Sequence, residues 1–144
     1  MSIDQIRFSS HGMSLAATLT LPAAVSVDRP GAAVVQGPGW LGLRDAKLYQ
    51  PYHEALLAAG IAVLVFDYRG FGDSEGDATL LDPRAQVEDY RSAATYLETR
   101  ADIDPARIGA FGSGATGGGN AIMAAGLDPR FKAIVSQVPI ADGR

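Results

Sequence analysis

One segment of the chain combines residue types and spacing that could do chemistry: Arg107–Asn120, which reads RIGAFGSGATGGGN. Its first five residues predict a strand, and its last residues predict a helix of small side chains, with glycines between the two. So many positions without side chains are needed only where a strand turns very sharply into a helix. Such a turn places one residue, or one ligand, at the N-terminus of the helix, where free backbone N–H groups stabilise negative charge.

The first interpretation of this segment is a nucleophile turn of the G-x-S-x-G kind, whose third position normally carries the attacking serine. The frame from Gly112 to Gly118 fits such a turn, but the nucleophile position holds Gly114, which has no side chain to attack with. Ser113 is the candidate substitute, although its side chain on a tight turn points away from the site that the nucleophile faces. Thr116 is expected to pack, and both hydroxyls are expected to bond to nearby backbone.

The second interpretation is a dinucleotide-binding loop, because Gly112-x-Gly114-x-x-Gly117 matches G-x-G-x-x-G between a strand and a helix. Such a loop normally begins its domain, and an acidic residue follows about 20 positions later, at the end of the next strand. Here the loop comes late, and the next predicted strand, Phe131–Val138, ends without a carboxylate. We therefore favour the nucleophile turn and keep dinucleotide binding as the alternative.

Composition narrows the class of protein further. The 144 residues suit one domain or one half of a larger one, and 47% hydrophobic and 19% charged residues are typical of a chain with a buried core. A net charge of −4 without a basic stripe argues against nucleic-acid binding. The longest apolar run, Ile61–Phe66, is too short to span a membrane, and the N-terminus lacks the apolar core of a signal peptide. The absence of cysteine fits a cytoplasmic protein. Because the chain also has only two histidines, we expect neither a metal nor a cofactor.

The hydrophobic pattern predicts an α/β fold. Alternating residues indicate an antiparallel hairpin of two strands, Ile3–Ser9 and Met13–Leu21. Buried strands are predicted at Ala32–Gln36, Ile61–Phe66, Arg107–Phe111 and Phe131–Val138, and helices at Ala46–Ala59, Pro83–Thr99 and Thr116–Leu127. Helices that connect buried strands imply a mostly parallel sheet with helices on both faces, in three layers, with the hairpin at one edge.

Four stretches, in this order, resemble the first half of the α/β-hydrolase fold: VVQGPGWLG, FDYRGFGDSEG, RIGAFGSGATGGGN and FKAIVSQVP. The closest similarity is to the dienelactone-hydrolase and X-Pro-peptidase-like branch of bacterial esterases and acyl hydrolases. The resemblance implies that residues 1–144 are the N-terminal half of a single α/β-hydrolase domain, with strands one to six present and the strands that bear the acid and the histidine absent. The implied substrate is a small acyl compound with an ester, lactone, thioester or amide carbonyl.

The resemblance also implies roles for individual residues. The backbone N–H groups of Trp40 and Ala115 are expected to form the oxyanion hole, and the Trp40 side chain is expected to face the substrate pocket. Pro38 stands where the family usually has histidine, and Gly114 stands where it has the nucleophilic serine. No base can be assigned, because His11 is expected in a hairpin turn and His53 on a helix surface. This chain alone is therefore expected to be inactive, and a non-catalytic binding or structural pseudo-hydrolase is a further alternative.

Two structural expectations complete the prediction. Asp67, Arg69 and Asp73 are expected to lock the DYRGFGDSEG turn by hydrogen bonds and a salt bridge. The strand 131–138 is expected to lie bare at the sheet edge, because it is apolar towards both faces and lacks protective charges. We therefore expect it to pair with a C-terminal half of the same protein or with a second copy of the chain.

Overall fold

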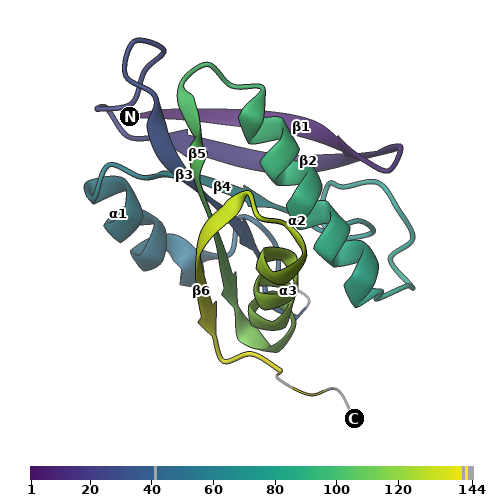
Figure 1. The fold of residues 1–144 in the computed structure, drawn as a ribbon. Helices are drawn as coiled ribbons and strands as arrows, with labels where there is room; N and C mark the ends of the chain where they lie inside the picture. The colour runs from purple at the N-terminus through teal and green to yellow at the C-terminus, as the bar shows by residue number, and fades with distance from the viewer. Residues whose placement is uncertain (41, 141, 143–144) are drawn as a thin grey trace.

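Six strands form one sheet in the order β1-β2-β4-β3-β5-β6 (Figure 1). The computed structural model describes residues 1–40, 42–140 and 142; the other four positions, 41 in the predicted loop and 141, 143 and 144 at the end of the predicted domain, lie outside the described residues. The strands are β1 (Ser2–Ser10), β2 (Met13–Leu21), β3 (Gly31–Gly37), β4 (Ala62–Phe66), β5 (Ile103–Ser113) and β6 (Phe131–Gln137). β1, β2 and β4 pair antiparallel, whereas β4, β3, β5 and β6 are parallel. This topology confirms the predicted mostly parallel sheet with the hairpin at one edge.

Helices cover the sheet on both faces. α2 (Pro83–Glu98) and α3 (Gly114–Leu127) lie on one face, and α1 (Gln50–Ala58) lies on the other, after a short 3-10 turn at Lys47–Tyr49 (Figure 1). α2 begins where predicted, because the Asp82 carboxylate accepts hydrogen bonds from two backbone N–H groups of its first turn and Pro83 takes the first position. Within the described parts of the chain, none of the helices has the length and apolar character that crossing a membrane requires.

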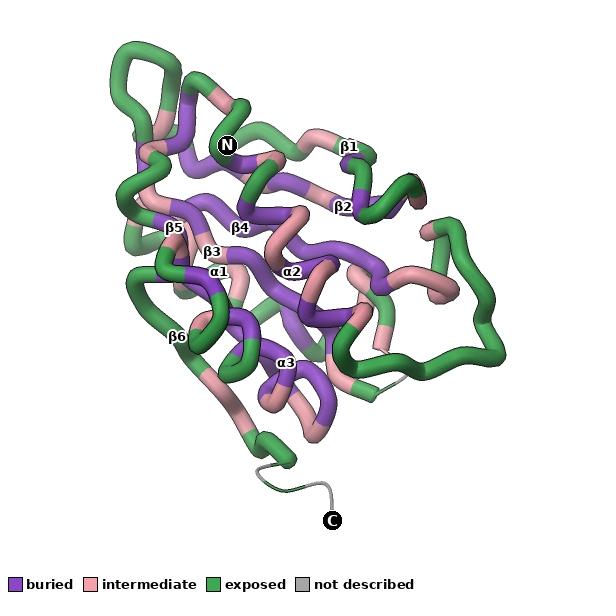
Figure 2. Tube along the Cα trace, turned by 45° about the vertical axis from the view of Figure 1, so that its right-hand side comes forward, coloured by how far each residue is buried: buried purple, intermediate pink, exposed green. Residues whose placement is uncertain are grey.

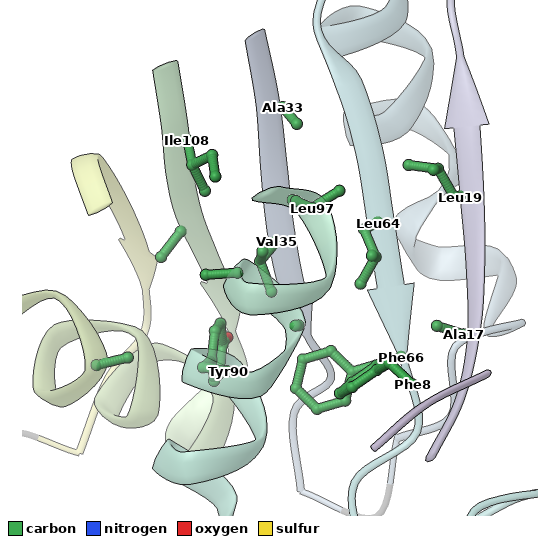
Figure 3. Packing of buried hydrophobic residues seen from close by; sticks show 14 of the residues in the cluster. Phe8, Ala17, Leu19, Ala33, Val35, Leu64, Phe66, Tyr90, Leu97 and Ile108 are labelled. Carbon is green, nitrogen blue, oxygen red and sulfur yellow. The ribbon is translucent and has the colours of Figure 1, made fainter. Parts of the chain in front are cut away.

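The core lies mainly between the sheet and α2. Figure 2 shows the central strands buried over much of their length, and all five residues of β4 are buried. Figure 3 shows Tyr90 of α2 lying against the strands, with Phe66 and Phe8 packed nearby. The rings of Phe66 and Tyr90 meet edge to face with centroids 5.4 Å apart. The packing of these large side chains anchors α2 across the sheet, close to the carboxyl ends of β3 and β5.

Some element bounds differ from the prediction, and each difference has a local cause. β5 begins at Ile103, because this residue pairs with Gly31 across an irregular step in the register. α1 is shorter than the predicted 46–59, since its first residues wind as a 3-10 turn. α3 begins at Gly114 and not at Thr116, so no loop separates it from β5. The strand-to-helix turn is therefore as sharp as the glycine cluster suggested.

Candidate active site

The turn from β5 into α3 is held tight by its glycines. Gly114 has φ +78°, a left-handed conformation that favours glycine. A Cβ on Gly112 would collide with the backbone carbonyl of Gly117, and a Cβ on Gly117 would lie 2.6 Å from the Pro38 carbonyl oxygen. Only residues without side chains let the first turn of α3 pack this closely on β5 and on the loop after β3.

Position 114, which the resemblance assigns to the nucleophile, faces that same loop. A Cβ built on Gly114 lies 3.2 Å from Gly39 Cα and 3.9 Å from the backbone nitrogen of Trp40. A side chain at position 114 would therefore point at the backbone that the resemblance nominates as an oxyanion donor. Ala115, the other nominated donor, is the next residue of α3. Ser113 makes no side-chain cap on this helix, so the N–H groups of its first turn are not capped by that hydroxyl.

Two buried tyrosines position the loop after β3. Tyr49 accepts a hydrogen bond from the Gly39 N–H at 2.9 Å. Tyr90 accepts one from the Gly37 N–H at 2.9 Å and donates one to the Phe111 carbonyl at 2.9 Å. Burial raises the pKa of Tyr90, so its hydroxyl keeps the proton that it donates. Tyr90 thus ties the ends of β3 and β5 together. Neither tyrosine was singled out from the sequence, because nothing in the local pattern marks such a long-range bond.

Ser113 lies on the other side of the turn. Its hydroxyl donates to the Gln137 side chain at 2.9 Å, and Gln137 in turn donates to the Tyr52 hydroxyl of α1 at 2.8 Å. The Ser113 side chain therefore binds towards the α1 face, whereas position 114 faces the loop after β3. Its bond to another side chain replaces the expected bond to local backbone.

Thr116 also differs from expectation. The residue is only 9% exposed, yet its hydroxyl oxygen has no hydrogen-bond partner among the described residues. It lines a small cleft together with the loop after β3. The other lining residues are Gly39, Trp40, Gly42, Tyr68, Phe71, Leu81 and Gln86. Trp40, 61% exposed, is one of these lining residues, and its role towards a substrate stays a prediction.

The histidines have partners of their own. A ring nitrogen of His53 contacts the Gln36 side chain, and burial lowers the pKa of His53 below its usual range. His11 lies 3.4 Å from Glu88. Neither makes a recorded hydrogen bond to the turn at Gly114 in the part of the chain that the structure describes. The same residues contain no cluster of three acidic or histidine side chains suited to a metal ion.

The DYRGFGDSEG turn is locked, but by more partners than the sequence suggested. Asp67, with a fully buried side chain, pairs with the Arg44 guanidinium and accepts a hydrogen bond from the Arg44 N–H at 2.8 Å. Arg44 also binds the exposed Asp73 at 2.7 Å and lowers the pKa of its carboxyl. Arg69 pairs instead with the buried Asp89 of α2 at 2.6 Å. Arg44 had no sequence signal of its own beyond its place in a glycine-rich loop.

Comparisons with known proteins identify the family and the fold of this chain. The model of the family described as X-Pro dipeptidyl-peptidase (S15 family) matches residues 11–144. The chain belongs to this family. The alpha/beta hydrolase GrgF from Penicillium sp. sh18 superposes with a TM-score of 0.87 at 26% identity, over 99% of this chain and 47% of GrgF. The protein thus has an α/β-hydrolase fold, as its sequence resemblance implied.

Two named relatives match this chain over most of its length. The quorum-quenching protein AidA of Acinetobacter baumannii is 38% identical over 139 residues, which are 96% of this chain and 44% of AidA. Thiohydrolase apmlB of Arthrinium phaeospermum is 40% identical over 113 residues, which are 76% of this chain and 35% of apmlB. The chain thus spans less than half the length of these relatives.

Proposed function

We propose that this protein is an acyl-hydrolase scaffold that binds the carbonyl group of an ester, lactone, thioester or amide, and that it performs no covalent serine step in this form. The observation that carries the proposal is the direction that a side chain at position 114 would take. A side chain there would lie against the backbone of Gly39 and Trp40. A carbonyl seated there would have its oxygen between the N–H of Trp40 and the N–H of Ala115.

The electrostatics of the turn support this binding mode. The N-terminus of an α-helix carries partial positive charge and several N–H groups without intrahelical acceptors. α3 begins at the turn, and Tyr90 and Tyr49 hold the opposing loop from behind. Donors that are held in place before the ligand arrives stabilise a carbonyl oxygen at little cost in reorganisation.

The absence of a nucleophile supports the second part of the proposal. Gly114 offers no atom that could attack a carbonyl carbon. The Ser113 hydroxyl is bonded to Gln137, and His53 to Gln36. A thioester or ester is therefore bound and released unchanged, and the name thiohydrolase, which one relative carries, supports a thioester as ligand.

Binding should depend on the Ala115 N–H and should not extend to dinucleotides. Proline lacks an N–H but is tolerated in the first turn of a helix, so Ala115→Pro removes one proposed donor with little damage to α3. We expect it to weaken binding of a panel of aryl esters, thioesters and lactones about tenfold, since one hydrogen bond to the carbonyl oxygen is lost. Saturation-transfer NMR and calorimetry measure this effect.

The matched control is Ala115→Gly, which keeps the N–H and should keep binding. NAD(H) should give no calorimetric signal at millimolar concentration. Ester binding that is indifferent to Ala115→Pro contradicts the oxyanion hole. A clear NAD(H) signal that is lost on Gly117→Ala would establish dinucleotide binding through Gly112–Gly117 in its place.

We further propose that the open side of β6 is covered in the functional protein, by a C-terminal half or by a second copy. β6 pairs with β5 on one side, and Ile134 and Val135 are 44% and 59% exposed. Beside them, on the α1 face, lies an apolar groove of about 240 Å³, lined among others by Leu56 and Phe111. A strand edge whose single charge, Lys132, lies near its start, next to an apolar groove, is a surface that normally finds a partner.

Purified residues 1–144 should therefore associate, and Val135→Lys should reduce the association. A lysine at the edge introduces a charge that opposes strand pairing. Light scattering measures the mass of the particles, and hydrogen exchange reports on protection of β6. Val27→Lys, at a position 65% exposed in the loop between β2 and β3, is the control and should leave the mass unchanged. A monomer in dilute solution with β6 fully protected would show that the edge needs no partner.

A further inference from the structure

Thr116 is the one residue beside the proposed oxyanion hole whose polar group has no partner among the described residues. Its hydroxyl oxygen is shielded from solvent and unbonded, and the residue is 9% exposed. Buried hydroxyls are nearly always hydrogen-bonded, so such a group calls for an explanation. Threonine within a helix often bonds to the carbonyl four residues earlier, but this one does not.

Thr116 borders the same cleft as one of the proposed donors. Helical side chains tilt towards the N-terminus of their helix, and Thr116 lies in the first turn of α3. The residue lines its cleft together with Gly39 and Trp40 of the loop after β3. Trp40 is one proposed donor, and Ala115, the other, directly precedes Thr116 in the chain.

The rest of the cleft is neutral and largely apolar. Phe71, Leu81 and the Trp40 ring contribute apolar surface, and no acidic residue is among those that line it. The cleft has no room for a water molecule in this conformation. Entry of a ligand requires the side chains of Leu81 and Trp40, which are 37% and 61% exposed, to move aside.

We propose that Thr116 is a third hydrogen-bond donor, and that together with the N–H groups of Trp40 and Ala115 it holds both oxygens of a carboxylate. The ligand is then a carboxylic acid with an aryl or alkyl body, which is the acid component of an ester or thioester. This inference rests on the proposed acyl-binding function and specifies its ligand. Two donors suffice for one oxyanion, whereas a carboxylate has two charged oxygens to satisfy. The uncapped start of α3, with no opposing carboxylate in the lining, favours that negative charge.

Thr116→Val tests the proposal, because valine has the shape of threonine without the hydroxyl. The ligands are phenylacetate and its neutral amide, phenylacetamide, measured by calorimetry on residues 1–144. We expect wild type to prefer the acid, and we expect Thr116→Val to weaken acid binding about ten- to a hundredfold while binding of the amide changes little. Thr116→Ser keeps the hydroxyl and should keep the preference.

The thermal stability of the free chain is the second measurement. A buried hydroxyl without a partner destabilises the folded state, so Thr116→Val should raise Tm by a few degrees in the absence of ligand. If the hydroxyl instead stabilised the fold, Thr116→Val would lower Tm. A lowered Tm, a variant that fails to fold, or an unchanged ratio of acid to amide affinity would each overturn the role of Thr116.

The proposed function is tested separately by the response of ester binding to Ala115→Pro. Suppose that Ala115→Pro weakens the binding of esters, but Thr116→Val leaves the binding of the acid unchanged. This result would remove the present inference and leave the acyl-binding function intact. Absence of binding for esters and acids alike would remove both.

Discussion

Replacing Gly114 by serine is expected to create a serine hydrolase when residues 1–144 are joined to the C-terminal half of an S15-family relative. A side chain at position 114 lies against the backbone of Gly39 and Trp40, so the new hydroxyl would stand beside the proposed oxyanion hole. A nucleophile that works with a base raises the rate of ester hydrolysis by about 10³-fold or more, by analogy with triad deletions in other serine hydrolases. Hydrolysis of aryl esters and labelling by a fluorophosphonate probe measure the gain.

The same substitution should destabilise the fold by about 1–2 kcal/mol, because a side chain is forced into a left-handed backbone conformation. The φ of +78° at Gly114 and the 3.2 Å approach to Gly39 Cα are the causes. Gly114→Ala carries the same strain without the hydroxyl and serves as the control, with no labelling. Wild type should also remain unlabelled. Stoichiometric labelling of wild type at Ser113 would refute the assignment of position 114, and so would an inert Gly114→Ser chimera that is folded and carries the relative's acid and histidine.

Removing the Asp67 carboxylate should be the most damaging single change to the fold. Its buried side chain pairs with Arg44 and also accepts the N–H groups of Arg44 and Asp73, at 2.8 and 3.2 Å. Asp67→Ala leaves the guanidinium, whose side chain is 18% exposed, without its buried partner, along with two backbone donors. Breaking a buried ion pair in this way costs about 3–5 kcal/mol, a large part of the roughly 5–15 kcal/mol that holds a domain together. Urea unfolding measures the loss.

Asp73 provides a matched control, because it binds the same arginine from the surface. Its side chain is 71% exposed, and the bond to Arg44 is 2.7 Å. Exposed ion pairs are weakened by water and salt, so Asp73→Ala should change the unfolding midpoint little. Equal losses for Asp67→Ala and Asp73→Ala would mean that burial does not decide the strength of the two bonds.

The difference between these two carboxylates illustrates what sequence analysis could not supply. Both belong to the DYRGFGDSEG stretch, and both were expected to lock its turn. Their common partner, Arg44, lies 23 residues before Asp67, in a different loop. Arg69 was grouped with them but pairs with Asp89 of α2. Composition and spacing indicate that a turn is held by charges, but which charges meet depends on how separate loops pack.

The candidate site also has some features that the sequence revealed and others that only the structure revealed. The sharp turn, the empty nucleophile position at Gly114 and the loop with Trp40 were all visible in the sequence, because glycine placement reports directly on backbone conformation. Tyr90 lies 53 residues from Gly37, and Thr116 was expected to bond locally. The unbonded Thr116 hydroxyl could emerge only when the surroundings of α3 were known.

By itself, the sequence determined the α/β class, the hairpin at one edge, the order of strands and helices, and the absence of a nucleophile side chain at Gly114. These follow from short-range rules, since hydrophobic period, turn residues and side-chain chemistry act within a few neighbouring positions. Only the tertiary structure decided that position 114 lies against the backbone of Gly39 and Trp40, that Ser113 binds Gln137 on the α1 side, and that the Thr116 hydroxyl is buried with no partner among the described residues. Each of these depends on the close packing of segments distant in the chain, where a few tenths of an ångström separate contact from collision.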